Sequence, residues 1–97
     1  MLAEPTVDCY DLVLYVAGTS PRMRQAYANL TTICSCHLGG RCRIRVVDLL
    51  RHPECAKSQQ IVVVPTLVWK SSSAVHTIVG DFSNHQKVLF GLEIRPS

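Results

Sequence analysis

The sequence lacks the features that mark membrane, secreted and nucleic-acid-binding proteins. No apolar run approaches the roughly 20 residues that a membrane-spanning helix needs. The first residues, Met1-Leu2-Ala3-Glu4-Pro5, have neither the basic residues nor the apolar stretch of a signal peptide. The 10 Lys and Arg residues form no dense run and are not interleaved with aromatic residues, which are 6% of the chain. We therefore expect a cytoplasmic protein that binds neither membranes nor nucleic acid.

The chain also lacks the paired cysteine framework of a small secreted domain. Its cysteines are odd in number and irregularly spaced, which indicates reduced thiols. The five are Cys9, Cys34, Cys36, Cys42 and Cys55. The segment Cys34-Ser35-Cys36-His37, followed by Cys42, has residue types that bind metals, but zinc sites normally use Cys-x-x-Cys spacing. We expect no metal site and no other cofactor.

The composition suits one compact domain. With 97 residues, of which 47% are hydrophobic and 18% charged, the chain can bury a single core but has no room for a second domain. We expect that domain to span residues 1–97, with residues 1–10 as a flexible N-terminal segment. Leu12-Val13-Leu14-Tyr15-Val16 is a continuous apolar run rich in β-forming residues, which predicts a central strand covered on both faces.

The clearest predicted helix follows this strand. Ser20 suits the N-cap position, and Pro21 suits the first helical position, where a missing N–H costs nothing. Between them and the next glycines, apolar residues recur at steps of three and four and form one inward stripe. The stripe consists of Met23, Ala26, Tyr27, Leu30, Ile33 and Cys34. Gly39-Gly40 then predicts the end of the helix in a left-handed turn.

The remaining patterns predict two helical segments and three strands. Alternation of basic and apolar residues predicts an edge strand, and a serine turn separates two later strands. Ser83 and Gln86 form a capping-box pattern for the last helix. The predicted segments are a strand over 43–48, a short helix or turn over 52–60, strands over 66–69 and 75–79, and a helix over 84–92. The resulting α/β order, βαβαββα, is similar to the thioredoxin fold.

Pro65 extends the similarity to that fold, but the usual redox chemistry has no nucleophile. In the thioredoxin fold this proline is usually cis and faces the start of the first helix, where redox enzymes have Cys-x-x-Cys. The matching stretch is Gly18-Thr19-Ser20-Pro21-Arg22-Met23, which contains no thiol. Disulfide exchange therefore lacks its low-pKa thiolate. His52, His76 and His85 have no hydrolytic partner set, so we interpret them as surface histidines and expect no catalytic residue and no enzyme activity.

Several segments, taken in order, resemble one known protein family. They cover nearly the whole chain from Asp11 to Ile94 without evident gaps, and the set is specific although each segment is short. The segments are Leu14–Gly18 with Ser20-Pro21, Val46–Leu49 with Pro53, Pro65–Leu67, Ile78–Asn84 and Lys87–Leu92. Residues 72–74 are Ser-Ser-Ala, where clock KaiB proteins commonly have prolines. The chain therefore resembles a divergent member of the KaiB family of circadian clock proteins.

The resemblance implies a non-catalytic regulator of a clock ATPase. It implies binding to a KaiC-type ATPase hexamer, modulation of the phosphorylation or ATPase cycle of that hexamer, and recruitment of KaiA or a clock histidine kinase. It also implies a metamorphic protein, in which a resting, often tetrameric form with the order βαββααβ interconverts with a thioredoxin-like monomer. We therefore expect a homo-oligomer in equilibrium between monomer and tetramer.

The pattern of the last segment is compatible with two structures. Its apolar residues alternate as in a strand, yet some of them also form one helical face. The alternating set is Val88, Phe90, Leu92 and Ile94, and the helical set is Val88, Leu89 and Leu92. Gly91 lowers helix stability by roughly 1 kcal/mol relative to Ala, so Gly91→Ala is predicted to favour the thioredoxin-like monomer. We assign the fold switch to Pro65, Gly91 and Glu93.

Six side chains are candidates for partner binding. Arginine makes planar, multidentate contacts at interfaces, and large aromatic residues anchor them. The candidates are Arg22, Arg24, Arg43, Arg45, Trp69 and Asn84. Solvated charge explains the arginines equally well, a core position explains Trp69, and helix capping explains Asn84 together with Asp81. Two other functions stay open, namely a thioredoxin-family redox protein that uses non-motif cysteines and a sensory domain of a clock histidine kinase.

Overall fold

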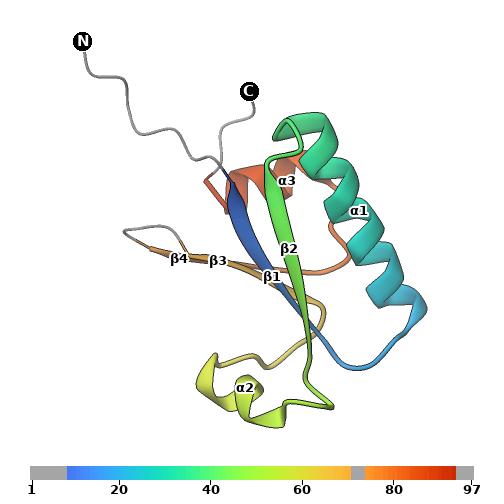
Figure 1. Cartoon of the computed structure of the whole chain (residues 1–97), viewed down its shortest axis with the longest axis vertical. Coiled ribbons are helices and arrows are strands. Elements are labelled where there is room, and N and C mark those ends of the chain that lie inside the picture. Colours follow the sequence, from blue (N-terminus) through green and yellow to red (C-terminus); the bar gives the residue numbers. More distant parts are fainter. Residues whose placement is uncertain (1–8, 71–73, 94–97) are drawn as a thin grey trace.

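The computed structural model describes residues 9–70 and 74–93, which form four strands and three helices (Figure 1). The elements are β1 (Tyr10–Val16), α1 (Pro21–His37), β2 (Cys42–Asp48), α2 (Pro53–Ser58), β3 (Thr66–Lys70), β4 (Val75–Val79) and α3 (His85–Gly91). This order confirms the prediction βαβαββα. The strand β1 begins at Tyr10, whose N–H donates to the Arg41 carbonyl at 2.7 Å. Tyr10 therefore belongs to the sheet and not to the flexible segment expected over residues 1–10. Its residues 1–8 lie outside the described residues.

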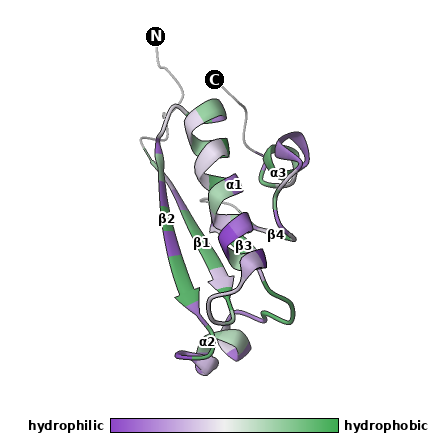
Figure 2. Cartoon of the chain, turned by 90° about the vertical axis from the view of Figure 1, so that its right-hand side faces the viewer, coloured by the Kyte–Doolittle hydropathy of each residue, from purple (hydrophilic) through white to green (hydrophobic). Residues whose placement is uncertain are grey.

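The strands form one mixed sheet with the order β2-β1-β3-β4. β1 and β2 are parallel and are connected through α1, whereas β3 is antiparallel to both β1 and β4. Side chains from β1, β3, α1 and α3 share one core, which places both helices on the same face of the sheet (Figures 1 and 2). The core includes Leu12, Leu14, Val16, Ala26, Leu30, Ile33, Leu67, Val88 and Leu89. The arrangement is the predicted thioredoxin-like α/β fold.

Helix α1 begins and ends at the predicted signals. The Ser20 hydroxyl oxygen accepts a hydrogen bond from the Met23 N–H at 3.1 Å, and Pro21 is the first helical residue. Beyond the helix, Gly39 and Gly40 have φ of +62° and +73°. Tyr27 is 43% exposed, so its assignment to the inward stripe was wrong. It lies on the flank of the narrower stripe formed by Ala26, Leu30, Ile33 and Cys34.

Among the described residues, no helix lies over the middle of the sheet face that turns away from α1 and α3, and we call it the open face. Alternate residues of each strand point to it. They are Asp11, Val13 and Tyr15 of β1, Arg43, Arg45 and Val47 of β2, Thr66, Val68 and Lys70 of β3, and Val75, Thr77 and Val79 of β4. The short helix α2 lies beyond the C-terminal ends of β1 and β2 (Figure 1). The prediction that β1 is covered on both faces was therefore wrong for its first half, where Val13 is half-buried.

The C-terminal third combines a hairpin with a capped helix. The Val64–Pro65 peptide bond is cis, as the fold led us to expect. The turn residues 71–73, which include Ser72 and Ser73, lie outside the described residues. Helix α3 is capped by Asn84, whose Oδ1 accepts from the Lys87 N–H at 3.1 Å, and not by Ser83. Both residue types cap helices, and the sequence does not decide between neighbours.

No helix within residues 9–70 and 74–93 has the length and apolar character to cross a bilayer.

Candidate functional site

The start of α1 is the position at which redox enzymes of this fold have their thiols. Here a hollow of about 380 Å³ is bordered by the loop after β1 and the loop after β2. Its lining includes Thr19, Met23, Asp48, Arg51 and His52. The side chains are a hydroxyl, a thioether, a carboxylate, a guanidinium and an imidazole, so the hollow has polar groups for recognition but no sulfur nucleophile.

The cysteines lie away from this hollow, and two of them are poor nucleophiles. Burial raises the pKa of the Cys34 thiol far above its usual value, and a hydrogen bond with Cys42 raises it further. Burial also raises the pKa of Cys42. Cys9 and Cys36 are exposed, and Cys55 is half-buried. Within the described residues, no group of three or more His, Cys, Asp or Glu side chains is arranged to hold a metal ion.

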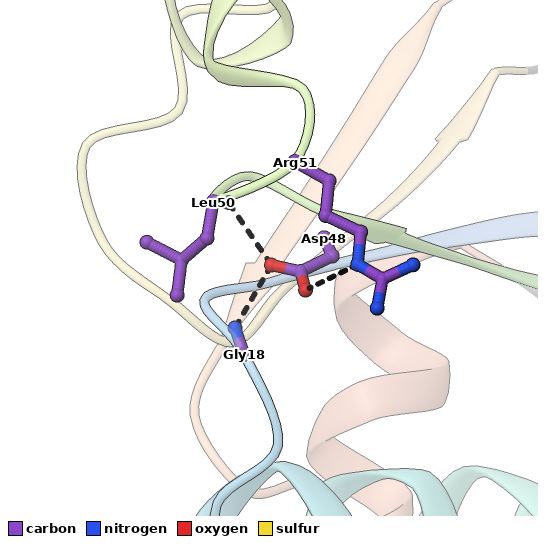
Figure 3. A network of polar contacts seen from close by, with 4 residues as sticks. All are labelled: Gly18, Asp48, Leu50 and Arg51. Atoms are coloured by element: carbon purple, nitrogen blue, oxygen red, sulfur yellow. Dashed lines mark hydrogen bonds and ion pairs between the residues drawn. The ribbon is translucent and has the colours of Figure 1, made fainter.

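Asp48 joins the two loops that border the hollow (Figure 3). Its Oδ1 accepts hydrogen bonds from the backbone N–H groups of Gly18 and Leu50, both at 2.9 Å, and its Oδ2 lies 3.9 Å from Arg51 Nε. These hydrogen bonds lower the pKa of Asp48 below its usual value. Gly18 has a φ of +69°, and a Cβ there would lie 3.1 Å from Leu50 Cδ1. Asp48 therefore holds the loop between β1 and α1 in place. The sequence alone did not indicate this role.

Replacing Asp48 with Ala is expected to destabilise the protein at pH 7, because two backbone N–H groups lose their shared acceptor. Since the folded-state pKa is lowered, the contribution of the carboxylate is fully present above the unfolded-state pKa of about 3.9 and is lost as the pH falls through the lowered folded-state value. Urea midpoints of wild type and Asp48→Ala should therefore differ at pH 7 and converge in acid. Asp48→Asn keeps an Oδ1 acceptor and should therefore lose less stability at pH 7 than Asp48→Ala does. A gap that stays constant from pH 7 to pH 2 would contradict this role.

The four candidate arginines do not form one cluster. Arg22 and Arg24 are exposed on the first turn of α1. Arg43 and Arg45 are exposed on β2 and belong to the open face, and Arg43 NH1 lies 3.8 Å from Asp11 Oδ1. The structure thus separates the arginines into two pairs on different parts of the surface.

Trp69 is part of an aromatic stack at the edge of the core. Its ring lies 5.5 Å from that of Tyr10 and stacks on that of His76, with centroids 4.9 Å apart. His76 is 9% exposed, so its interpretation as a surface histidine was wrong. Its Nδ1 lies 3.3 Å from Glu93 Oε2, which joins the end of α3 to β4. No local pattern predicts this contact, because a turn and a whole helix separate His76 from Glu93.

The beginning of α3 also contacts α1 through histidines. His37 Nε2 and His85 Nδ1 are 3.4 Å apart and the rings meet edge to face, so His85 is half-buried rather than a plain surface residue. Asn84 is engaged as the N-cap of α3. Asp81 accepts from the Ser83 N–H at 3.0 Å, which lowers the pKa of Asp81. Helix capping, the alternative expected for Asn84, is therefore observed, whereas Asp81 holds the turn before the helix.

The three proposed switch residues each have a distinct geometry. Pro65 follows the cis bond, and Glu93, which follows the C-cap of α3, has a φ of +55°. Gly91 lies against β4 so closely that an added Cβ would be 2.1 Å from Ile78 Cδ1. A side chain at position 91 would therefore require the far end of the Ile78 side chain to shift.

The KaiB domain family matches residues 13–94. Circadian clock protein KaiB3 of Synechocystis sp. is 41% identical over 85 residues, which are 88% of this chain and 83% of that protein. The circadian clock oscillator protein KaiB of Thermosynechococcus vestitus is 37% identical over 90 residues, which are 93% and 83% of the two chains.

Two solved structures support the fold. The N-terminal domain of Synechococcus elongatus SasA superimposes with a TM-score of 0.73 at 15% identity, covering 96% of this chain and 91% of that one. Mitochondrial thioredoxin 3 from Saccharomyces cerevisiae superimposes with a TM-score of 0.67 at 17% identity, covering 89% and 78%. The family match, the clock-protein relatives and the thioredoxin-like architecture agree, and the chain belongs to the KaiB family of circadian clock proteins.

Proposed function

We propose that this protein regulates a KaiC-type ATPase hexamer by binding it, and that it is not itself an enzyme. The observation that carries the proposal is the match to the KaiB domain over residues 13–94, together with relatives named as circadian clock proteins. The absence of a thiol from Gly18 to Met23 agrees with a recognition role for the start of α1. By binding one state of the ATPase better than another, the protein modulates the phosphorylation or ATPase cycle.

The proposed partners follow from the family. When bound to the ATPase, the protein recruits KaiA or a clock histidine kinase, and in its free form it is a cytoplasmic homo-oligomer in equilibrium between monomer and tetramer. The arginine pairs on α1 and β2 are candidates for contact with an acidic surface of the ATPase, because arginine favours planar carboxylate contacts. Trp69 and Asn84 already have partners within the chain, so they contribute to binding mainly by holding their elements in place.

A fold switch gives a reason for slow regulation. If the ATPase captures the thioredoxin-like monomer, and the free protein rests mostly in another arrangement, the apparent affinity falls by the fraction of competent protein. Two arrangements that differ by a few kcal/mol are sufficient for this effect. Association then waits for a rare conformation, and the delay sets the timing.

The test is complex formation with the KaiC-type ATPases of the same organism. We expect the purified protein to co-elute with at least one of these hexamers in analytical gel filtration, and the amount bound to differ between ATP and ADP. The complex should build up over a time much longer than mixing. A failure to co-elute with any of them, in either nucleotide, would remove the proposal.

A further inference from the structure

The open face combines an apolar floor with positive charge. Its residues form rows across the sheet, because Arg45 is the register partner of Val13, and Val13 is the register partner of Val68. Val68 and Tyr15 are 5% and 7% exposed, while Arg45 and Lys70 are exposed. The charged residues thus border a floor of well-packed apolar side chains.

A small depression lies on this floor. It has a volume of about 170 Å³, and its lining consists of Asp11, Val13, Tyr15, Arg45, Val68 and Lys70. The lining comes from β1, β2 and β3, so the depression lies at the middle of the sheet rather than in a loop. A rigid sheet supplies a preformed surface, which reduces the ordering cost of binding.

The depression has more positive than negative charge around it. Asp11 is paired with Arg43 at 3.8 Å, and among residues 9–70 and 74–93 neither Arg45 nor Lys70 has a carboxylate within ion-pair distance. Two cations therefore face solvent on either side of an apolar floor, and within the described residues the one carboxylate of the lining, Asp11, is paired with Arg43 instead. Such a surface attracts carboxylates and repels other cations.

We infer that the open face is a docking surface for an acidic protein segment that has an apolar side chain between carboxylates. The apolar side chain occupies the depression above Val13 and Val68, and the carboxylates meet Arg45 and Lys70. This inference rests on the proposed function, because the segment is assigned to the KaiC-type ATPase. It selects Arg45 over the arginines of α1 for this contact and adds Lys70, which the sequence did not indicate.

The test compares charge reversals on the two sides of the molecule. Arg45→Glu and Lys70→Glu are each expected to weaken binding of the ATPase by about tenfold or more, because like charges then face each other across the contact. The matched control is Lys87→Glu, which makes the same change on α3, on the helical side. This control should bind within about threefold of wild type. Circular dichroism and urea unfolding should show that all three variants remain folded.

A second readout separates charge attraction from a structural effect. The association rate of wild type should fall as KCl rises from low to physiological ionic strength, and this dependence should be weaker in Arg45→Glu and Lys70→Glu. If wild type binds the ATPase and both variants bind it as tightly as wild type does, the open face is not the docking surface, and the proposed function stands. If wild type itself fails to bind, both are wrong. Equal loss of binding in Lys87→Glu would also overturn the assignment to the open face.

Discussion

Replacing Leu89 with Ala is expected to lower the free energy of unfolding of the thioredoxin-like monomer by about 2–5 kcal/mol. Leu89 is 2% exposed and belongs to the shared core, so its truncation leaves a cavity between α3 and the sheet. The substitution acts on α3, the element that we propose adopts a different structure in the resting form. Urea unfolding followed by circular dichroism measures the effect, and sedimentation under native conditions measures any shift toward an oligomer.

The neighbouring Phe90 provides the matched control. It is 85% exposed on the same helix, so Phe90→Ala should change the stability of the monomer by no more than about 0.5 kcal/mol. In a strand, however, Phe90 would lie on the side of Val88 and Leu92 and would be buried with them. Phe90→Ala is therefore expected to decrease any oligomeric resting form, whereas Leu89→Ala should increase it. Equal effects of both substitutions would contradict the two-structure interpretation of this segment.

Local sequence signals were sufficient for much of the fold. The cap at Ser20, the glycines after α1 and the apolar alternation each depend on residues close together in the chain, and they located all seven elements. Apolar periodicity does not say how far each layer extends, however. The apolar run at Leu12–Val16 does not indicate whether α2 covers the sheet or lies beyond it. Tyr27 likewise fits the helical spacing of the apolar stripe, although it lies on the flank of that stripe and is exposed.

The sites were less accessible to the sequence because their contacts join distant segments. The Asp48 carboxylate holds a loop 30 residues earlier, and the contact of His76 with Glu93 forms only when α3 lies on β4. The open face likewise becomes visible only once the register puts Arg45 and Lys70 on one side. Residue types alone therefore suggested candidates for binding but could not group them by surface.

At Gly91, a distant contact opposes the effect that helix propensity predicts. Helix propensity favours Ala over Gly by roughly 1 kcal/mol, which is why the sequence alone predicts that Gly91→Ala stabilises the thioredoxin-like monomer. The structure adds Ile78, whose Cδ1 would be 2.1 Å from the new Cβ and which packs against the core. Overpacking of this kind typically costs about 1–3 kcal/mol. We now expect Gly91→Ala to destabilise the monomer, as measured by urea unfolding and by NMR populations.

A double-mutant cycle with Ile78→Val isolates this clash. Valine lacks Cδ1, and the next atom, Cγ1 of Ile78, is 3.4 Å from the position of the added Cβ, which is an ordinary contact. Ile78→Val alone should cost about 0.5–1.5 kcal/mol. In the Ile78→Val background, Gly91→Ala should become stabilising, because helix propensity then acts without the clash. A stabilising effect of Gly91→Ala in both backgrounds would show that Ile78 turns aside freely, and the population would then shift toward the monomer as helix propensity alone predicts.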